Sequence, residues 1–242
     1  MEHFLDTMES IPAGYGFLLF GKIHLMWLGV FAVFAIGCCL LYCKLSESYR
    51  KYWKAAFAAL LMANELFKVI LLLIGGNFRW TYLPLHLCSI NVFCILWHVW
   101  RPSAWMDNFL YMVCVPGAVA ALLFPAWNTL PIMNGMHIHS FLAHIMLATY
   151  PIVLTISGEI QPDVKKIPAC LGMLVGMAIP IYVLNRLLGT NFMFLMYAEP
   201  GNPLYLFERW FGSHLWGFPV ITAGVLLVMY VPVVLLNKGR KT

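Results

Sequence analysis

The chain has 242 residues, of which 62% are hydrophobic and only 10% are charged, and its mean hydropathy is +0.81. Soluble domains carry about 25% charged residues, so this composition excludes a soluble globular protein. The formal net charge of +5 is divided among short segments, which excludes the clustered basic face of a nucleic-acid-binding protein. We therefore predict an all-α, polytopic transmembrane bundle that forms one domain over residues 1–242.

The first twenty residues carry Glu2, Asp6 and Glu9 and have no basic n-region. We interpret them as a short exposed arm and not as a cleaved signal peptide. Seven apolar segments follow, each near the roughly 20 residues that a helix needs to cross the hydrocarbon layer. They span residues 22–43, 54–75, 81–100, 108–124, 138–156, 167–187 and 213–236.

Lysines and arginines are unevenly divided between the two sides of these segments. Ten lie in the loops after the first, third and fifth segments and after the last one, and four lie on the opposite side. Cytoplasmic loops carry the excess of basic residues. This pattern predicts a multi-pass protein of the plasma membrane with its N-terminus outside and its C-terminus in the cytoplasm.

The seven cysteines all fall within the apolar segments or at their ends, and no CxxC pair occurs among them. A free cysteine usually behaves as a small buried hydrophobe, and we interpret six of them in this way. Cys88 is the exception, because residues 83–91 also hold a proline, a histidine and an asparagine. Polar groups at membrane depth are costly and usually face a protein interior or a cavity.

Several polar residues share the outer half of the predicted bundle. Counted from the outer helix ends, Lys68 and Cys88 lie roughly 10 Å deep, His144 roughly 9 Å and Glu65 about 15 Å. Asn185 and Arg186 lie close to the outer end of their segment. The inner half shows little beyond His98. This asymmetry predicts one cavity that opens outward.

Helical spacing indicates which side chains share a face. In the third segment one stripe should carry Thr81, Pro84, Cys88 and Asn91, with His86 pointing elsewhere. In the fifth segment a second stripe should carry His137, Ser140 and His144, with His139 off the stripe. Glu65 precedes Lys68 at i, i+3, which is a favourable order for an ion pair.

These residues suggest a covalent catalyst. A cysteine thiol needs a base or a cation beside it before it becomes a good nucleophile. His144 lies at the same depth and could accept the proton, while Lys68 could instead stabilise a thiolate. Asn91, one turn from Cys88, could donate to an oxyanion, and Asn185 is a second candidate for an oxyanion or head-group contact.

Each assignment has a structural alternative. The Glu65–Lys68 pair could simply neutralise itself, Cys88 could be a packing residue, and His144 could make an interhelical hydrogen bond. His137, His139 and His144 lack the spacing and the carboxylate of a metal site, so no metal is expected. The sequence shows no cofactor-binding motif, so no cofactor is expected. The connection 196–212, rich in aromatics, reads as an interfacial loop that could also cap the cavity.

The chain resembles the YwaF-like bacterial integral membrane proteins over nearly its whole length. The resemblance is carried by LPLHLC at 83–88, residues 117–125, HSFLAH at 139–144 and NRLLGTNFMFLM at 185–196. Such proteins tend to close on a Trp-Pro-Trp-Tyr-like run, whereas this chain has LWGFP at 215–219.

That family is distantly similar to a vertebrate multi-pass acyltransferase that places polyunsaturated acyl chains on ether phospholipids. The resemblance implies a reactive membrane cysteine at Cys88. A second distant group, the androgen-induced and androgen-regulated membrane hydrolases of fatty-acid esters, uses a threonine and a histidine. Its histidine would correspond to His144.

The sequence thus predicts a lipid acyltransferase, or a lipid ester hydrolase, with membrane lipids as its partners and with no protein partner indicated. Its catalytic residues would be Cys88, His144 and Asn91. The alternative is a non-enzymatic carrier or lipid-binding protein with a structural cysteine. The residues predicted to contact a lipid or solute are Glu65, Lys68, His86, His139, Asn185, Arg186 and Asn191.

Overall fold

The computed structural model describes residues 2–198 and 202–239, with side chains as far as residue 235. These residues form helices and loops, without a strand. Within them, six helices are long and apolar enough to cross a membrane, and a shorter apolar helix accompanies them. The predicted polytopic helical bundle is therefore confirmed. The helices are α1 (Lys22–Lys44), α2 (Glu47–Ile74), α3 (Leu87–Trp100), α4 (Ala104–Phe109), α5 (Val115–Leu123), α6 (Gly135–Ile156), α7 (Ile167–Leu188), α8 (Leu204–Phe211) and α9 (Gly217–Gly239).

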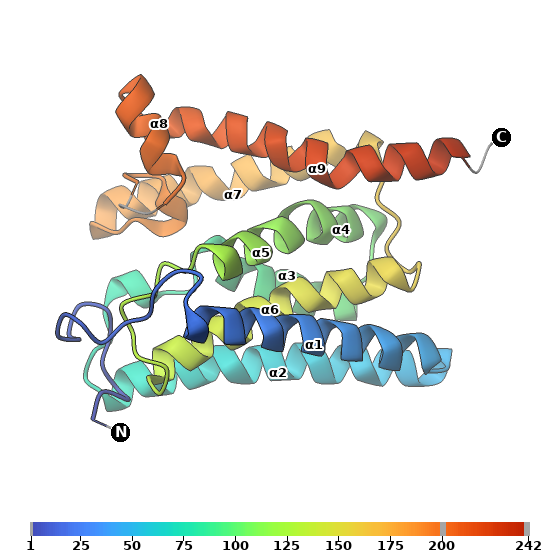
Figure 1. The fold of residues 1–242 in the computed structure, drawn as a ribbon. Coiled ribbons are helices and arrows are strands. Elements are labelled where there is room, and N and C mark those ends of the chain that lie inside the picture. Colours follow the sequence, from blue (N-terminus) through green and yellow to red (C-terminus); the bar gives the residue numbers. More distant parts are fainter. Residues whose placement is uncertain (1, 199–201, 240–242) are drawn as a thin grey trace.

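The long helices run roughly parallel, with the described ends of the chain at opposite ends of the bundle (Figure 1). Helices α1 and α2 lie on one side, and α7 and α9 lie on the other (Figure 1). Helix α6 packs against α1, α2 and α5. Of the residues in its most apolar stretch 72% are buried, against 6% for α1, so α6 is the central helix and α1 lies at the periphery of the bundle.

The third helix is shorter than the sequence predicts. Helix α3 begins at Leu87, and the residues before it form a loop with a 3-10 turn at Trp80–Tyr82. Pro84 explains this start, because the residue before a proline is driven out of the helical region, and Leu83 has φ −56° and ψ 148°. The predicted stripe is therefore wrong in part, since Thr81 and Pro84 do not belong to the helix that carries Cys88.

The fourth crossing contains a π-helical turn. Helices α4 and α5 are continuous through this turn, Leu110–Cys114, and Val115 N–H donates to Leu110 O five residues earlier. The crossing begins at Ala104, four residues before the predicted start. Such turns insert one extra residue into a helix and are frequent at functional sites.

The connection after α7 holds a helix that the sequence reading did not predict. Residues Leu204–Phe211 form α8, which projects from one end of the bundle (Figure 1). Its exposed side chains include Leu206, Trp210 and Phe211. Aromatic residues of this kind favour the membrane interface, so the predicted interfacial position of this segment fits its shape.

The first residues fold back across one end of the bundle and are tied to it. We call residues 2–17 the N-terminal strap. The side-chain amide of Asn134 donates to His3 O and Asp6 O at 2.7 and 2.8 Å, and Gly135 N–H donates to Phe4 O at 2.9 Å. A Cβ at Gly135 would lie 2.5 Å from the Leu71 side chain, so glycine permits this close approach. The predicted exposed arm is therefore tied to the bundle by hydrogen bonds, while many of its residues are exposed as expected.

Candidate functional site

We call the buried or partly buried polar residues at this end of α2, α3 and α6 the polar layer: Glu65, Lys68, Cys88, Ser89, His139 and His144. The ion pair between Glu65 and Lys68 on α2 lies within it. The Glu65 and Lys68 side chains are each only 9% exposed, and the Lys68 ammonium donates to Glu65 Oε1. The Ser89 hydroxyl of α3 donates to the same carboxylate oxygen at 3.2 Å. The pairing predicted from the i, i+3 spacing is thus present, and it also links α2 to α3.

Cys88 is the second residue of α3 and is partly exposed. Lys68 and Glu65 lie close enough for their charges to act on its thiol. The N-cap residue His86 makes no side-chain capping bond, so the N–H groups of the first turn keep their positive partial charge. A helix N-terminus and a neighbouring cation both favour the thiolate form of cysteine.

A loop from the far side of the bundle covers the start of α3. We call residues 190–196 the covering loop. Met193 N–H donates to His86 Nδ1 at 3.4 Å, and the Phe192 ring meets the His86 ring edge-on with centroids 5.2 Å apart. The loop therefore packs the Phe192 ring against His86, which precedes Cys88 by two residues.

Two asparagines shape this loop. Asn185 Oδ1 accepts from Thr190 Oγ1 and Phe192 N–H, both at 2.8 Å, and its Nδ2 donates to Phe192 O at 3.0 Å. Asn191 Oδ1 accepts from the Met196 backbone at 3.0 Å. Both amides predicted to contact a ligand are engaged in holding the loop, so their geometry supports a positioning role.

The covering loop is strained. Met193 and Phe194 have φ values of 57° and 55°, the left-handed region that costs a residue with a Cβ about 1–2 kcal/mol. Such conformations persist where the surroundings enforce them, and they cluster at functional sites. Two consecutive strained residues beside His86 therefore favour a functional role for this end of the bundle.

His139 faces α2 and not the stripe of His144, as predicted. Its Nδ1 donates to Asn64 O at 2.9 Å, and Asn64 Nδ2 donates to His139 O at 3.1 Å. The ring also lies within range of the Lys68 charge. With the Nδ1 proton committed, the neutral ring carries its free lone pair on Nε2.

His144 also donates its Nδ1 proton to a carbonyl, that of Ser140 at 2.7 Å, and its ring stacks on Trp127 with centroids 4.9 Å apart. Within the described residues no hydrogen bond joins His144 to Cys88. The structure thus brings Cys88 together with Lys68, Glu65 and His86, and gives His144 other partners. The Cys88–His144 pair stays a prediction.

The two remaining candidates differ in their surroundings. Asn91 is 2% exposed, and its Oδ1 has no hydrogen-bond partner in the described part of the chain. Oxygen and nitrogen of an amide can exchange places by a flip, so Asn91 offers an unused polar group one turn from Cys88. Arg186 is exposed on α7 and stands apart from the layer.

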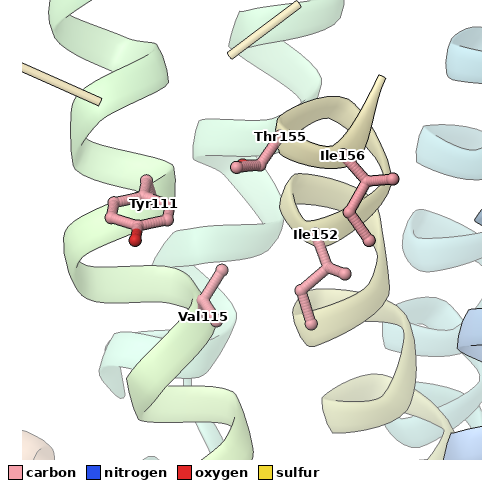
Figure 2. Close-up of a pocket in the computed structure, with 5 residues that line it drawn as sticks. All are labelled: Tyr111, Val115, Ile152, Thr155 and Ile156. Carbon is pink, nitrogen blue, oxygen red and sulfur yellow. The ribbon is translucent and has the colours of Figure 1, made fainter. Parts of the chain in front are cut away.

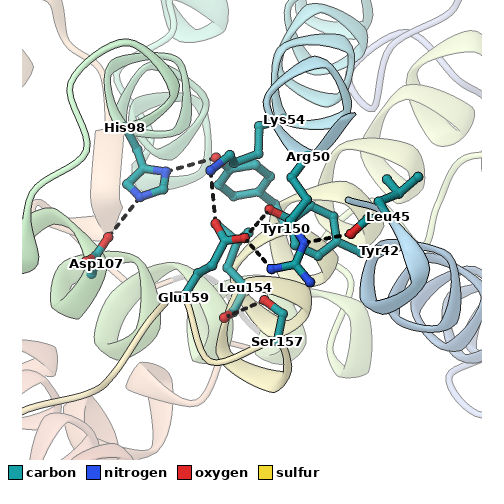
Figure 3. A network of polar contacts seen from close by, with 10 residues as sticks. All are labelled: Tyr42, Leu45, Arg50, Lys54, His98, Asp107, Tyr150, Leu154, Ser157 and Glu159. Carbon is teal, nitrogen blue, oxygen red and sulfur yellow. Dashed lines mark hydrogen bonds and ion pairs between the residues drawn. The ribbon is translucent and has the colours of Figure 1, made fainter. Parts of the chain in front are cut away.

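A second polar network, which the sequence did not predict, gathers around Glu159 (Figure 3). Glu159 lies in the loop after α6, at the opposite end of that helix from the N-terminal strap (Figure 1). The Glu159 carboxylate accepts from Tyr42 at 2.7 Å, Lys54 at 2.9 Å and Arg50 at 3.2 Å. Partial burial raises the pKa of Glu159, but these hydrogen bonds and charges outweigh it and hold the pKa below the usual 4.5. The only sequence signal was the set of basic residues after the first predicted segment, of which Arg50 and Lys54 lie in the first turns of α2.

His98 belongs to the same end and links three helices. Its Nδ1 lies 2.9 Å from the Tyr150 hydroxyl, and its Nε2 lies 2.8 Å from Asp107 Oδ1 (Figure 3). Tyr150 is fully buried. Each of the three side chains thus has a hydrogen-bond partner, and we interpret the network as a structural link between α3, α4 and α6.

Two hollows lie away from the polar layer. One of about 100 Å³ opens beside the π turn, and Figure 2 shows its lining residues Tyr111, Val115, Ile152, Thr155 and Ile156. The other, of about 490 Å³, follows α9 from Ala223 to Leu235. Neither is lined by Cys88 or Lys68, so the predicted outward-opening cavity is not one of them.

Among the described residues no cluster of His, Cys, Asp or Glu is arranged to hold a metal ion.

The membrane-length helices and the buried charged layer define a polytopic α-helical membrane protein. The chain belongs to the TMEM164 family, whose family model matches residues 19–230. The matched region contains every candidate site residue and leaves out the N-terminal strap. No match was found among curated proteins or among solved structures.

Proposed function

We propose that the protein transfers acyl chains between membrane lipids, with Cys88 as the nucleophile. The observation that carries the proposal is the position of Cys88, which lies at the uncapped N-terminus of α3 beside the buried Lys68 charge. Both features favour a thiolate, and they act against the burial of Cys88 and the Glu65 carboxylate, which disfavour it. The resemblance to YwaF-like proteins and to the ether-phospholipid acyltransferase supports the same assignment, and the plasma membrane is the proposed location.

The reaction would proceed in two steps. The Cys88 thiolate attacks the carbonyl carbon of a lipid ester, the carbon–oxygen bond breaks, and the released lysolipid alkoxide takes a proton. A hydroxyl group of the acceptor lipid then loses its proton and attacks the resulting thioester, which regenerates the Cys88 thiolate. Before the first step the free Nε2 of His139 or of His144 takes the proton of the Cys88 thiol. The resulting imidazolium protonates the departing alkoxide, and the neutral ring then accepts the proton of the acceptor hydroxyl.

Two further groups would act on the developing charge. The first-turn N–H groups of α3 and the unused amide of Asn91 can donate to the oxyanion of the tetrahedral intermediate. The positive charge of Lys68 would stabilise the thiolate, and the paired carboxylate of Glu65 would partly neutralise that positive charge. His86, Asn185 and Asn191 would fix the covering loop, while Arg186 remains available for a lipid head group at the outer surface.

A trapping experiment tests this proposal. The purified protein is incubated in lipid nanodiscs with a phospholipid whose acyl chain carries an alkyne, and the labelled residue is located by mass spectrometry. We expect a thioester on Cys88 that hydroxylamine removes. Cys88→Ala should abolish the label, whereas Cys94→Ala, on the same helix but deeper, should retain it.

The alternative is a lipid carrier without catalysis, and one observation favours it: Glu65 already neutralises Lys68. In that case the alkyne lipid would copurify equally with the wild type and with Cys88→Ala, and no thioester would form on either protein. That result would reject the acyltransferase.

A further inference from the structure

The N-terminal strap spans the ends of two helices that frame the polar layer, on the side that the distribution of basic residues predicts to lie outside. It is bonded to the end of α2, where Asn77 Nδ2 donates to Leu5 O at 3.0 Å. It is bonded to the start of α6 through Asn134 and Gly135. The Tyr82 hydroxyl, from the loop before α3, donates to Glu9 at 2.6 Å. The strap is therefore fixed to all three segments that lead into the layer.

The burial of the layer needs such a cover. Lys68 lies seven residues before Gly75, which is about 10 Å along a helix. His139 lies only four residues after Gly135, about one turn. Charged and polar groups this close to helix ends are normally reached by water, yet Lys68 and His139 are 7% and 6% exposed.

The covering loop closes the remaining part of this end. It contacts His86 through Phe192 and Met193, directly beside the first turn of α3. Cys88 nevertheless keeps partial exposure, and its neighbours Leu87 and Ile90 are partly buried hydrophobic residues. Cys88 itself packs against the same apolar core cluster, so its surroundings combine apolar side chains with the ion pair.

We propose that the N-terminal strap and the covering loop seal the polar layer from the outer aqueous phase, so that a ligand reaches Cys88 from within the bilayer. The ligand is then a membrane lipid that enters sideways, and a water-soluble acyl donor is excluded. This inference rests on the proposed function for the role of Cys88 as the reacting group.

Thiol labelling in nanodiscs tests the seal, because both membrane faces and the lipid phase are then available. The native protein is treated with a charged methanethiosulfonate or with uncharged N-ethylmaleimide, and modification is followed at each cysteine by mass spectrometry. We expect N-ethylmaleimide to modify Cys88 and the charged reagent to leave it unmodified. Cys43, exposed at the end of α1, reports that the charged reagent is active, and buried Cys114 reports that the fold is intact.

Loosening the strap should admit the charged reagent. Asn134→Asp keeps the oxygen that caps α6 but removes both donations to the strap, and Asn77→Ala removes a third. We expect the combined variant to raise the rate of charged-reagent modification at Cys88 by about tenfold, because each lost bond favours local opening. Asn202→Asp is the control, since Asn202 Oδ1 accepts from Leu204 N–H at the start of α8, away from the strap.

Three outcomes would overturn the inference. They are rapid modification of Cys88 by the charged reagent in the native protein, no reaction of Cys88 with N-ethylmaleimide, and an equal effect of the strap variant and the α8 control. These readouts require no catalysis. A protein that shows the expected labelling but forms no thioester would keep the seal and reject the acyltransferase.

Discussion

The thiol of Cys114 donates to the carbonyl of Leu147 at 3.3 Å, and this bond replaces one that α6 cannot make. Pro151 lies four residues after Leu147 and has no N–H group, so the Leu147 carbonyl has no partner within its own helix. The π turn presents Cys114 at this point. A neighbouring helix thereby satisfies a backbone group that a proline left open inside the membrane.

Removing this donor should destabilise the bundle. We expect Cys114→Ala to lower the free energy of unfolding by about 1 kcal/mol, because a buried carbonyl loses its bond. The measurement is unfolding in detergent, with Cys43→Ala as the exposed control. In a Pro151→Ala background the helix can supply its own N–H, so the cost of Cys114→Ala should shrink. An unchanged cost would show that packing, and not the bond, accounts for the loss.

The ion pair on α2 gives a second prediction. Lys68→Met leaves a buried carboxylate without its partner, and we expect a loss of about 3–5 kcal/mol. Glu65→Gln combined with Lys68→Met should recover most of it. A thermal unfolding series separates these variants. If the double variant folds but forms no thioester, Lys68 acts on Cys88, whereas a Lys68→Met protein as stable as the wild type would contradict the burial of the pair.

The Glu159 network predicts loss of stability in acid. Because hydrogen bonds hold the pKa of folded Glu159 below 4.5, the unfolded state takes up a proton first as the pH falls. The stabilisation is therefore complete above about pH 4.5 and is lost as the pH falls through the folded pKa. The melting temperature of the wild type should drop over this range. Glu159→Gln should start lower and lose this component of the pH dependence.

Two substitutions in the backbone after α7 should change the free energy of unfolding in opposite directions. Gly189 ends the helix with φ 66°, so Gly189→Ala should cost about 1 kcal/mol. Met193 has φ 57° with a Cβ, so Met193→Gly should relieve up to about 1 kcal/mol of strain. Unfolding measurements on both variants check the pair. Destabilisation by Met193→Gly would mean that the packing of the Met193 side chain outweighs the strain.

The distribution of basic residues predicts the orientation of the chain. A protease-sensitive tag at the C-terminus should be protected in intact cells, and one at the N-terminus should be accessible, because cytoplasmic loops hold the lysines and arginines. The reverse pattern would place the polar layer in the cytoplasmic half and would overturn its predicted depth.

Apolar length and charge spacing were enough to predict most of the architecture. The helix predicted for 22–43 is observed at Lys22–Lys44, and Glu65 pairs with Lys68. The start of α3 could also have been predicted, since Pro84 carries a known restriction on Leu83. Continuous hydrophobicity concealed that break, because a loop at the membrane surface can be as apolar as a helix.

The details of the site depend on contacts that periodicity does not encode. The reciprocal bonds between Asn64 and His139 require the relative rotation of α2 and α6, which follows from the packing of both helices. The two bonds of Asn185 Oδ1 to residues 190 and 192 require a loop shape that no motif specified. The strap is similar, since it is held mostly through its own backbone carbonyls, which have no sequence signature.

The π turn at Leu110–Cys114 also fixes the angular phase of its helix. Each residue of an α-helix turns the chain by about 100°, so one inserted residue rotates everything before it by that angle relative to everything after it. Asp107 and Asn108, on one side of the insertion, meet His98 and Asp163, while Cys114 at its end meets Leu147. Deleting one residue of the turn would leave the segment hydrophobic enough to insert, yet only one of these two sets of partners could then be reached at a time.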